Sequence, residues 1–259
     1  DAAHPNRLGA SFVAKPTRAD LLAGASTLRG ANVHVTIRSG RQAADGVLVG
    51  AGGGTVTTPE GASLEIPAGA LAADTPVFVD TVETDATGLA LPPGYEVVGA
   101  VDVDLSGATL GAGARLSVPA VAGGAARVVV ARVVTAGGRR FAKVVARVVD
   151  AGGTFRSTTE APPQLPFAGV AASGLYAFIR VPVAFGYVVA TVTEGGAPAA
   201  GVRVTIDRTP FGDVTGGSGG ALAIGVADNA DNAVDAASLA TQSTGSAVAR
   251  LGGQDAVTP

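Results

Sequence analysis

A run of oxygen-bearing side chains, DNADNAVD, occupies positions 228–235. Carboxylate and amide oxygens are the ligands that Ca²⁺ prefers, so Asp228, Asp231 and Asp235 are candidate calcium ligands. The spacing does not match a calcium loop of the form D-x-D/N-x-D/N-G, because Ala230 stands where a ligand belongs and no glycine follows. A solvated polar loop is the simpler interpretation, and no other metal or cofactor site is predicted.

Histidine and cysteine chemistry has little support in this chain. His4 and His34 are the only histidines, and neither belongs to a zinc or triad motif. With no cysteine there is neither a disulfide nor a thiolate metal site. The glycines of Gly50–Gly54 resemble a phosphate loop but lack the Lys-Ser/Thr that follows one, so they are interpreted as a hinge. We therefore predict no catalytic residues and no enzymatic activity.

Binding is the next chemistry that the side chains could perform. Six cationic side chains lie on one predicted hairpin. They could form a stripe that faces an acidic glycan or a neighbouring subunit. Alternatively, they are the solvated side of the hairpin, or they protect an edge strand from pairing. They are Arg127, Arg132, Arg139, Arg140, Lys143 and Arg147. A sugar site that relies on stacking against aromatic rings has little support, since the chain has no Trp and only three Tyr. Paired carboxylates of the glycosidase kind leave no sequence signature, so that alternative stays open.

Composition and charge favour an exported protein. The net charge of −3 argues against a nucleic-acid partner. No apolar run approaches the roughly 20 residues that a membrane span needs. The 259 residues include no Met, and DAAHPNRLGA at the start is not a signal peptide. We expect a secretory leader cleaved before Asp1; the alternative is a fragment. The scarcity of Lys and the abundance of Ala, Gly and Val suggest a bacterial protein.

The elements that must position these side chains are predicted to be strands. Apolar and polar residues alternate with a period of two over many short segments, and 38 Gly and 15 Pro separate them. We predict helix below about 10% of residues, against a typical third. The predicted strands are Asn32–Ile37, Val47–Val49, Thr55–Thr57, Pro76–Val82, Tyr95–Val98, Val101–Leu105, Arg115–Val118, Arg127–Val134, Phe141–Val149, Tyr187–Thr193 and Gly201–Asp207.

The segment Gly52–Leu71 combines a glycine hinge, two short strands and a proline stop. Leu64 and Ile66 alternate with polar residues, and Pro67 ends the second strand because it has no N–H to donate. We expect Ile66 to be buried and 68–71 to form a tight turn that returns Leu71 to the core. The sequence of Ile66–Leu71, IPAGAL, resembles the signature of ZU5-like β-sandwich domains of bacterial surface proteins. The pieces Gly88–Gly107 and Ala172–Pro182 extend that resemblance.

A second module is predicted from residue 184 onward. Tyr187–Thr193, a Gly/Pro turn at Glu194–Ala200 and Gly201–Asp207 resemble the opening of carboxypeptidase-regulatory-like and invasin-type Ig-like domains. Ala240–Leu251 resembles a later hairpin of the same domains. Between them, Arg208–Ala237 is interpreted as an enlarged loop that is functional, mobile or partly structured, with Ala221–Val226 as a candidate strand.

These observations predict an all-β chain of two β-sandwich (Ig-like) modules in tandem. The parts are an N-terminal arm (1–30), a ZU5-like sandwich (31–183) and an Ig-like sandwich (184–259), the last one strand short. The expected function is a secreted, cell-surface structural protein, either a filament subunit or a stalk segment; the alternative is an adhesin module that binds a glycan or a partner protein. Self-association could use the arm, whose apolar residues are Leu8, Phe12, Val13, Leu21 and Leu22.

Overall fold

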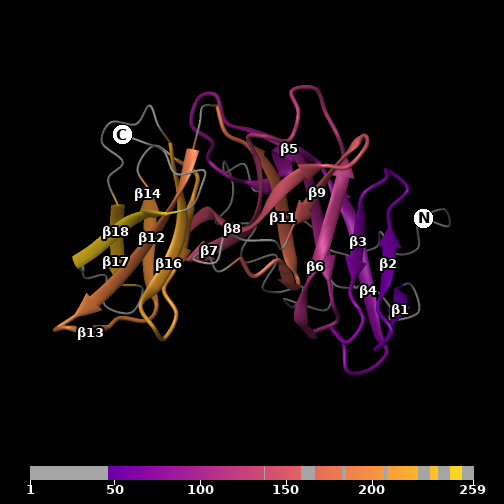
Figure 1. Ribbon diagram of the computed structural model, residues 1–259, viewed down its shortest axis with the longest axis horizontal. Helices are drawn as coiled ribbons and strands as arrows, with labels where there is room; N and C mark the ends of the chain where they lie inside the picture. Colours follow the sequence, from indigo (N-terminus) through magenta and orange to yellow (C-terminus); the bar gives the residue numbers. More distant parts are fainter. Residues whose placement is uncertain are drawn as a thin grey trace, which may run out of the picture. The chain divides into compact units, whose positions relative to one another are not determined.

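The computed structural model describes residues 46–136, 138–158, 167–182, 185–206, 209–226, 234–238 and 246–252 (Figure 1). The chain divides into two units, Asp1–Gly46 and Val47–Pro259, and all the described strands belong to the second. The described residues are all-β, as predicted, with one 3₁₀ helix, η3 (Thr84–Thr87), and no α-helix. The predicted arm and the predicted strand at Asn32–Ile37 lie outside the described residues.

The first eleven strands form one large sheet, nearly closed on itself. Their order across it is β1-β4-β5-β11-β7-β8-β9-β6-β3-β2, with β10 paired to β6, and the strand pairs are antiparallel. In chain order they are β1 (Val47–Val49), β2 (Gly54–Thr57), β3 (Ser63–Ile66), β4 (Thr75–Val82), β5 (Glu96–Asp104), β6 (Thr109–Pro119), β7 (Val128–Ala136), β8 (Arg139–Asp150), β9 (Thr154–Thr158), β10 (Val170–Ala172) and β11 (Gly174–Arg180).

Alternation of side chains explains most of these strands. In β5, Val101 and Val103 are buried whereas Asp102 is only half-buried, as a period of two requires. The two predicted strands in this region are a single strand that runs through Gly99. A Cβ at Gly99 would lie 3.0 Å from Cγ2 of Val118 on β6, so β5 and β6 pack face to face across the interior. The glycine permits that approach without ending the strand.

The IPAGAL segment has the structure that its residues predict. Ile66 ends β3 with 2% of its surface exposed, and Pro67 follows the strand directly. The N–H of Ala70 bonds to the carbonyl of Pro67 at 3.2 Å, which closes a tight turn. Leu71 is buried at 4% exposure. The predicted return of Leu71 to the core is confirmed.

The inside of the large sheet holds the first hydrophobic cluster, called here the interior core. It is built from aliphatic side chains on both halves of the curled sheet together with a few aromatic rings. The largest fully buried members are Tyr176, Phe155, Phe178, Leu64, Leu105 and Leu116. A sheet of this size can therefore bury a core without disulfides.

The remaining strands form two small sheets. One contains β13-β12-β16 with β18 also paired to β12, and the other is β15-β14-β17. Their bounds are β12 (Phe185–Glu194), β13 (Ala197–Pro198), β14 (Val202–Ile206), β15 (Gly212–Val214), β16 (Gly220–Val226), β17 (Val234–Ser238) and β18 (Ser246–Gly252). Val192, Val204 and Ala221 come from both sheets and share one buried cluster, so the two sheets face each other.

The segment 208–237 is more regular than a loop. It contains β15, β16 and the start of β17, so of the three alternatives the partly structured one is confirmed for the described residues, and the candidate strand at Ala221–Val226 is part of β16. Six strands were not predicted: β9, β10, β11, β13, β15 and β17. All but β11 have five residues or fewer, too few for alternation to be distinguished from chance. β11 has seven residues, and its segment entered the sequence analysis only as part of the resemblance at Ala172–Pro182.

Candidate functional site

The first half of β8 is an edge that the chain itself covers. β9 pairs only with Arg147–Asp150, so the earlier residues of β8 have no full strand on that side. The N–H of Ala142 donates to the carbonyl of Pro210 at 2.8 Å, and Ala142 forms an isolated parallel bridge with Phe211. Further along, the carbonyl of Val145 accepts from the N–H of Gly169 at 2.9 Å. Two backbone groups on the open side of β8 are thus satisfied.

Behind this contact lies a second cluster, called here the junction core. It combines residues of the large sheet, among them Val129 and Ala142, with Ile206, Phe211 and Leu222 from the segments that follow. Phe211 is fully buried, and its ring meets Tyr95 edge-on with the centroids 6.1 Å apart. The large sheet and the small sheets are therefore joined by shared apolar packing.

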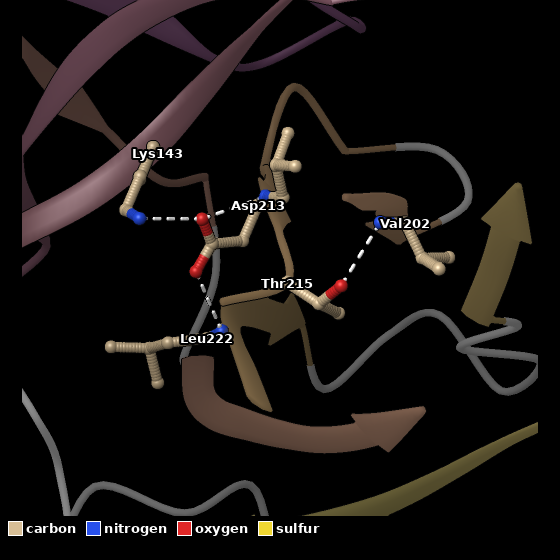
Figure 2. A network of polar contacts seen from close by, with 6 residues as sticks. Lys143, Val202, Asp213, Thr215 and Leu222 are labelled. Atoms are coloured by element: carbon tan, nitrogen blue, oxygen red, sulfur yellow. Dashed lines mark hydrogen bonds and ion pairs between the residues drawn. The ribbon is translucent and has the colours of Figure 1, made fainter. Parts of the chain in front are cut away.

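A buried carboxylate joins the same two regions (Figure 2). One oxygen of Asp213 lies 2.7 Å from Nζ of Lys143 on β8, and the other accepts from the N–H of Leu222 on β16 at 3.1 Å. The N–H of Val214 also donates to this carboxylate at 2.7 Å. The side chain of Asp213 is 8% exposed, and a charge that deep is tolerated only when it is paired and hydrogen-bonded. The three donors meet that requirement.

Thr215 makes a second polar bridge inside the small sheets. Its hydroxyl accepts from the N–H of Val202 at 2.9 Å (Figure 2). It also donates to the carbonyl of Ala199 at 2.6 Å. The residue is 4% exposed, so this hydroxyl replaces water for two backbone groups. The bridge fixes β14 against the residue that follows β13.

Two tyrosines have perturbed acidities. Burial raises the pKa of Tyr95 to about 12, and its hydroxyl is buried without a hydrogen-bond partner among the described residues. Burial also raises the pKa of Tyr176, although the nearby Arg132 and a hydrogen bond to Ala172 oppose the rise. Both hydroxyls remain protonated near neutral pH. Burial, not an acid–base partner, raises both pKa values.

A half-open cleft of about 450 Å³ lies beside the junction. Its floor includes the buried residues Phe141, Ile206 and Phe211, and its more exposed walls carry Arg139 and Arg140. Thr205, Thr209, Pro210, Gly88 and Ala90 complete the lining. The described lining residues include no carboxylate, so the cleft is cationic.

Arg140 is held in place by the end of η3. Its Nη1 donates to the carbonyl of Thr87 at 3.1 Å. Gly88 caps this helix in the left-handed conformation, with φ of 64°. A Cβ at Gly88 would collide with Nη1 of Arg140, so only glycine lets the guanidinium come this close. A guanidinium has five N–H donors, and this bond uses one of them.

The six cations of the predicted hairpin do not form one outward stripe. Arg127 donates to the carbonyl of Pro182, and Arg132 donates to the carbonyl of Ser173 at 2.6 Å. Lys143 is paired with Asp213, and Arg147 also has an interaction partner. The hairpin itself is confirmed, because β7 pairs with β8 along its length. The open side of the first half of β8 is met by backbone bonds to Pro210 and Gly169, and protection of this edge by the cations stays a prediction. Arg139 and Arg140 remain together at the cleft.

The other predicted site residues cannot be placed. Asp228 and Asp231 lie outside the described residues, and for Asp235 only the backbone is described, in β17 opposite Thr205. His4, His34 and the arm residues Leu8, Phe12, Val13, Leu21 and Leu22 also lie outside the described residues. The calcium site and the arm contacts stay predictions. Among the described residues, no three His, Cys, Asp or Glu side chains gather in a way that could hold a metal ion.

Sequence reasoning missed Asp213, Phe211 and Gly88. Phe211 carried a usable signal, because it is a large apolar residue in a stretch otherwise rich in Gly, Asp and Thr. Such an isolated aromatic residue is a candidate anchor against another element. The roles of Gly88 and Asp213 depend on contacts between distant segments, for which the sequence has no local signal.

Comparisons of the sequence with protein families and with curated proteins find no match. No protein-family model matches the chain. No curated protein matches it either. Among the described residues no helix is long and apolar enough to cross a bilayer. The sequence and the geometry above therefore carry the functional argument alone.

Proposed function

We propose that the protein is a non-enzymatic structural component of a bacterial cell surface, either a filament subunit or a stalk segment, that associates with copies of itself or with neighbouring domains. In this proposal it is secreted and consists of a ZU5-like β-sandwich followed by an Ig-like one. Its work is mechanical: it spaces or connects parts of an extracellular assembly.

The exposed apolar edge of the large sheet carries this proposal. β1 ends the strand order and has one strand partner, β4, among the described residues. Leu48 and Val47 on this strand are 67% and 48% exposed. Monomeric proteins usually protect an edge with charge, proline or a cover, because unpaired backbone groups beside apolar side chains recruit other strands. An apolar edge of this kind suits strand-to-strand association.

Two further features support the tandem-sandwich part of the proposal. The hydroxyl of Tyr176 donates to the carbonyl of Ala172, four residues upstream, at 2.6 Å. A tyrosine bonded back to the nearby backbone is a hallmark of Ig-like sandwiches, where it fixes a corner between strands. The junction core and the Asp213–Lys143 pair favour a stiff connection between the two regions, as a segment that transmits tension requires.

Edge substitution tests the proposal directly. Leu48→Lys places a charge on β1 and should raise the protein concentration at which light scattering reports assembly. Val149→Lys is the matched control, because Val149 is 40% exposed but lies on β8 inside the strand order. Equal assembly by both variants, or a wild-type chain that stays monomeric at every concentration, would reject self-association through this edge.

The arm hypothesis has its own test. In a donor-strand arrangement, residues 1–30 would add a strand to a neighbour's sheet, and a chain without them should remain folded but fail to assemble. Electron microscopy of the native source would show whether the chain repeats along a filament. If the chain without residues 1–30 still assembles, the arm hypothesis is wrong, and the edge of β1 stays the candidate contact.

A further inference from the structure

The cleft beside the junction has the chemistry of an anion site. Arg139 and Arg140 lie in its walls, and the described lining includes no acidic side chain to neutralise them. Guanidinium groups bind carboxylates and sulfates through parallel N–H···O bonds, and these charge-assisted bonds are among the stronger ones in proteins. Two of them in one concave site favour an oxyanion there.

The guanidinium of Arg140 is positioned before any ligand arrives. The bond to the Thr87 carbonyl and the close approach to Gly88 fix its location. A side chain that is already ordered loses less conformational entropy on binding, so more of the interaction free energy appears as affinity. Arg139 is exposed and makes no such bond to the described residues, so it can adjust to the ligand.

The backbone beside the cleft disfavours an extended peptide as the ligand. A peptide that adds to a sheet needs free N–H and carbonyl groups along an edge. At this point the N–H of Ala142 is already bonded to Pro210, and Phe211 occupies the bridging position. A peptide could therefore form ion pairs with the arginines of the cleft but no ladder of backbone hydrogen bonds.

The size and the walls of the cleft fit a short stretch of acidic carbohydrate. Its volume of about 450 Å³ lies within the range of small-molecule sites. The aromatic residues of the floor, Phe141 and Phe211, are buried, so they offer no open ring face for stacking a neutral sugar. Recognition must come from charge and from polar groups at the rim, such as Thr205.

We propose that this cleft binds an acidic polysaccharide, with Arg140 and Arg139 holding the carboxylate or sulfate groups of the sugar. The site would give a surface protein an attachment to an acidic glycan. It does not depend on self-association, because every described residue that lines it belongs to one chain.

Calorimetric titration of the full chain with defined probes tests the site. The acidic probes are oligogalacturonate, for carboxylate, and dextran sulfate, for sulfate; their matched neutral forms are the methyl-esterified oligogalacturonate and dextran. Arg140→Ala should weaken binding of an acidic probe about tenfold or more, since it removes charge-assisted bonds. Arg139→Ala should weaken it less, and added salt should weaken it in every case.

Two variants separate the site from a general charge effect. Arg156→Ala removes the same charge from an exposed position on β9 and should leave affinity unchanged. Gly88→Ala keeps all charges but displaces Arg140, so it should reduce affinity, with thermal denaturation confirming that it still folds. The proposal would be overturned if neither acidic probe bound, if the neutral forms bound equally well, or if Arg156→Ala caused an equal loss of affinity. Poly-glutamate is the probe for an acidic peptide, and tighter binding of it than of the acidic sugars would also overturn the proposal.

Discussion

The interior core and the junction core achieve burial by different means. In the interior core, strands of one sheet curl around aliphatic side chains and a few aromatic rings, and the alternation of each strand supplies them. In the junction core, apolar packing around Phe211 is combined with the ion pair of the buried Asp213 carboxylate and with the backbone hydrogen bond from Ala142 to Pro210. The interior depends on a repeated pattern, whereas the junction depends on a few individual residues. Damage should therefore spread widely in the first region and stay local in the second.

Among the substitutions that test this comparison, Ile66→Asp should lower the stability of the folded chain most. It places an unpaired charge in the interior core, where Ile66 is 2% exposed, and buried charges cost several kcal/mol unless they are paired. We expect the large sheet to unfold, with loss of the β signal in far-ultraviolet circular dichroism. Glu65→Gln, at the neighbouring exposed position, should change stability by less than about 1 kcal/mol. A melting temperature that Ile66→Asp leaves unchanged would contradict the assignment of this core.

Phe211→Ala should destabilise the junction by about 3–5 kcal/mol, the usual cost of removing a buried phenylalanine ring. Because the interior core is untouched, we expect calorimetry to resolve an early transition of the small sheets followed by that of the large sheet. A single transition, shifted as a whole, would mean that the two cores unfold together.

Asp213→Ala should have an intermediate effect of about 1–3 kcal/mol, because it leaves the N–H groups of Leu222 and Val214 without their acceptor. Lys143 is 40% exposed and can turn to water, which limits the loss. Asp213→Asn keeps an acceptor oxygen and should cost less than Asp213→Ala in denaturant unfolding. If the two variants were equally unstable, the charge and not the hydrogen bonds would hold the junction.

The smallest effect concerns Tyr95 at alkaline pH. Its pKa of about 12 in the folded chain exceeds the ordinary value of 10, so folding favours the protonated hydroxyl. The resulting stability is fully present below pH 10 and is lost as the pH rises toward 12. Tyr95→Phe should flatten this decline in the free energy of unfolding, as measured by denaturant titration at each pH. Ultraviolet titration should show that this hydroxyl ionises later than a free tyrosine; a normal pKa would contradict its burial.

The same contrast explains how much the sequence could predict. Strands of the large sheet such as β4 and β8 follow from alternation and turn residues, and IPAGAL predicts both a buried isoleucine and the following turn. Gly99 misled the prediction, because a glycine that permits close packing inside β5 was read as a break between two strands. The junction could not be derived, since the contacts of Phe211 and Asp213 join segments far apart in the chain. Likewise, nothing near Arg140 in the sequence indicates that Gly88 lies beside it.

The bond between Ala142 and Pro210 also has a directional consequence. Proline accepts a hydrogen bond through its carbonyl but has no N–H to return, so it satisfies β8 without extending the ladder. The chain thus covers the open first half of β8 with a residue that cannot propagate pairing, so a strand from another copy finds no ladder to join in the middle of the sheet. Strand addition to the large sheet is therefore left, among the described strands, to the two ends of its strand order, β1 and β2. Two ends without a third edge between them are the geometric condition for a linear polymer instead of a branched aggregate.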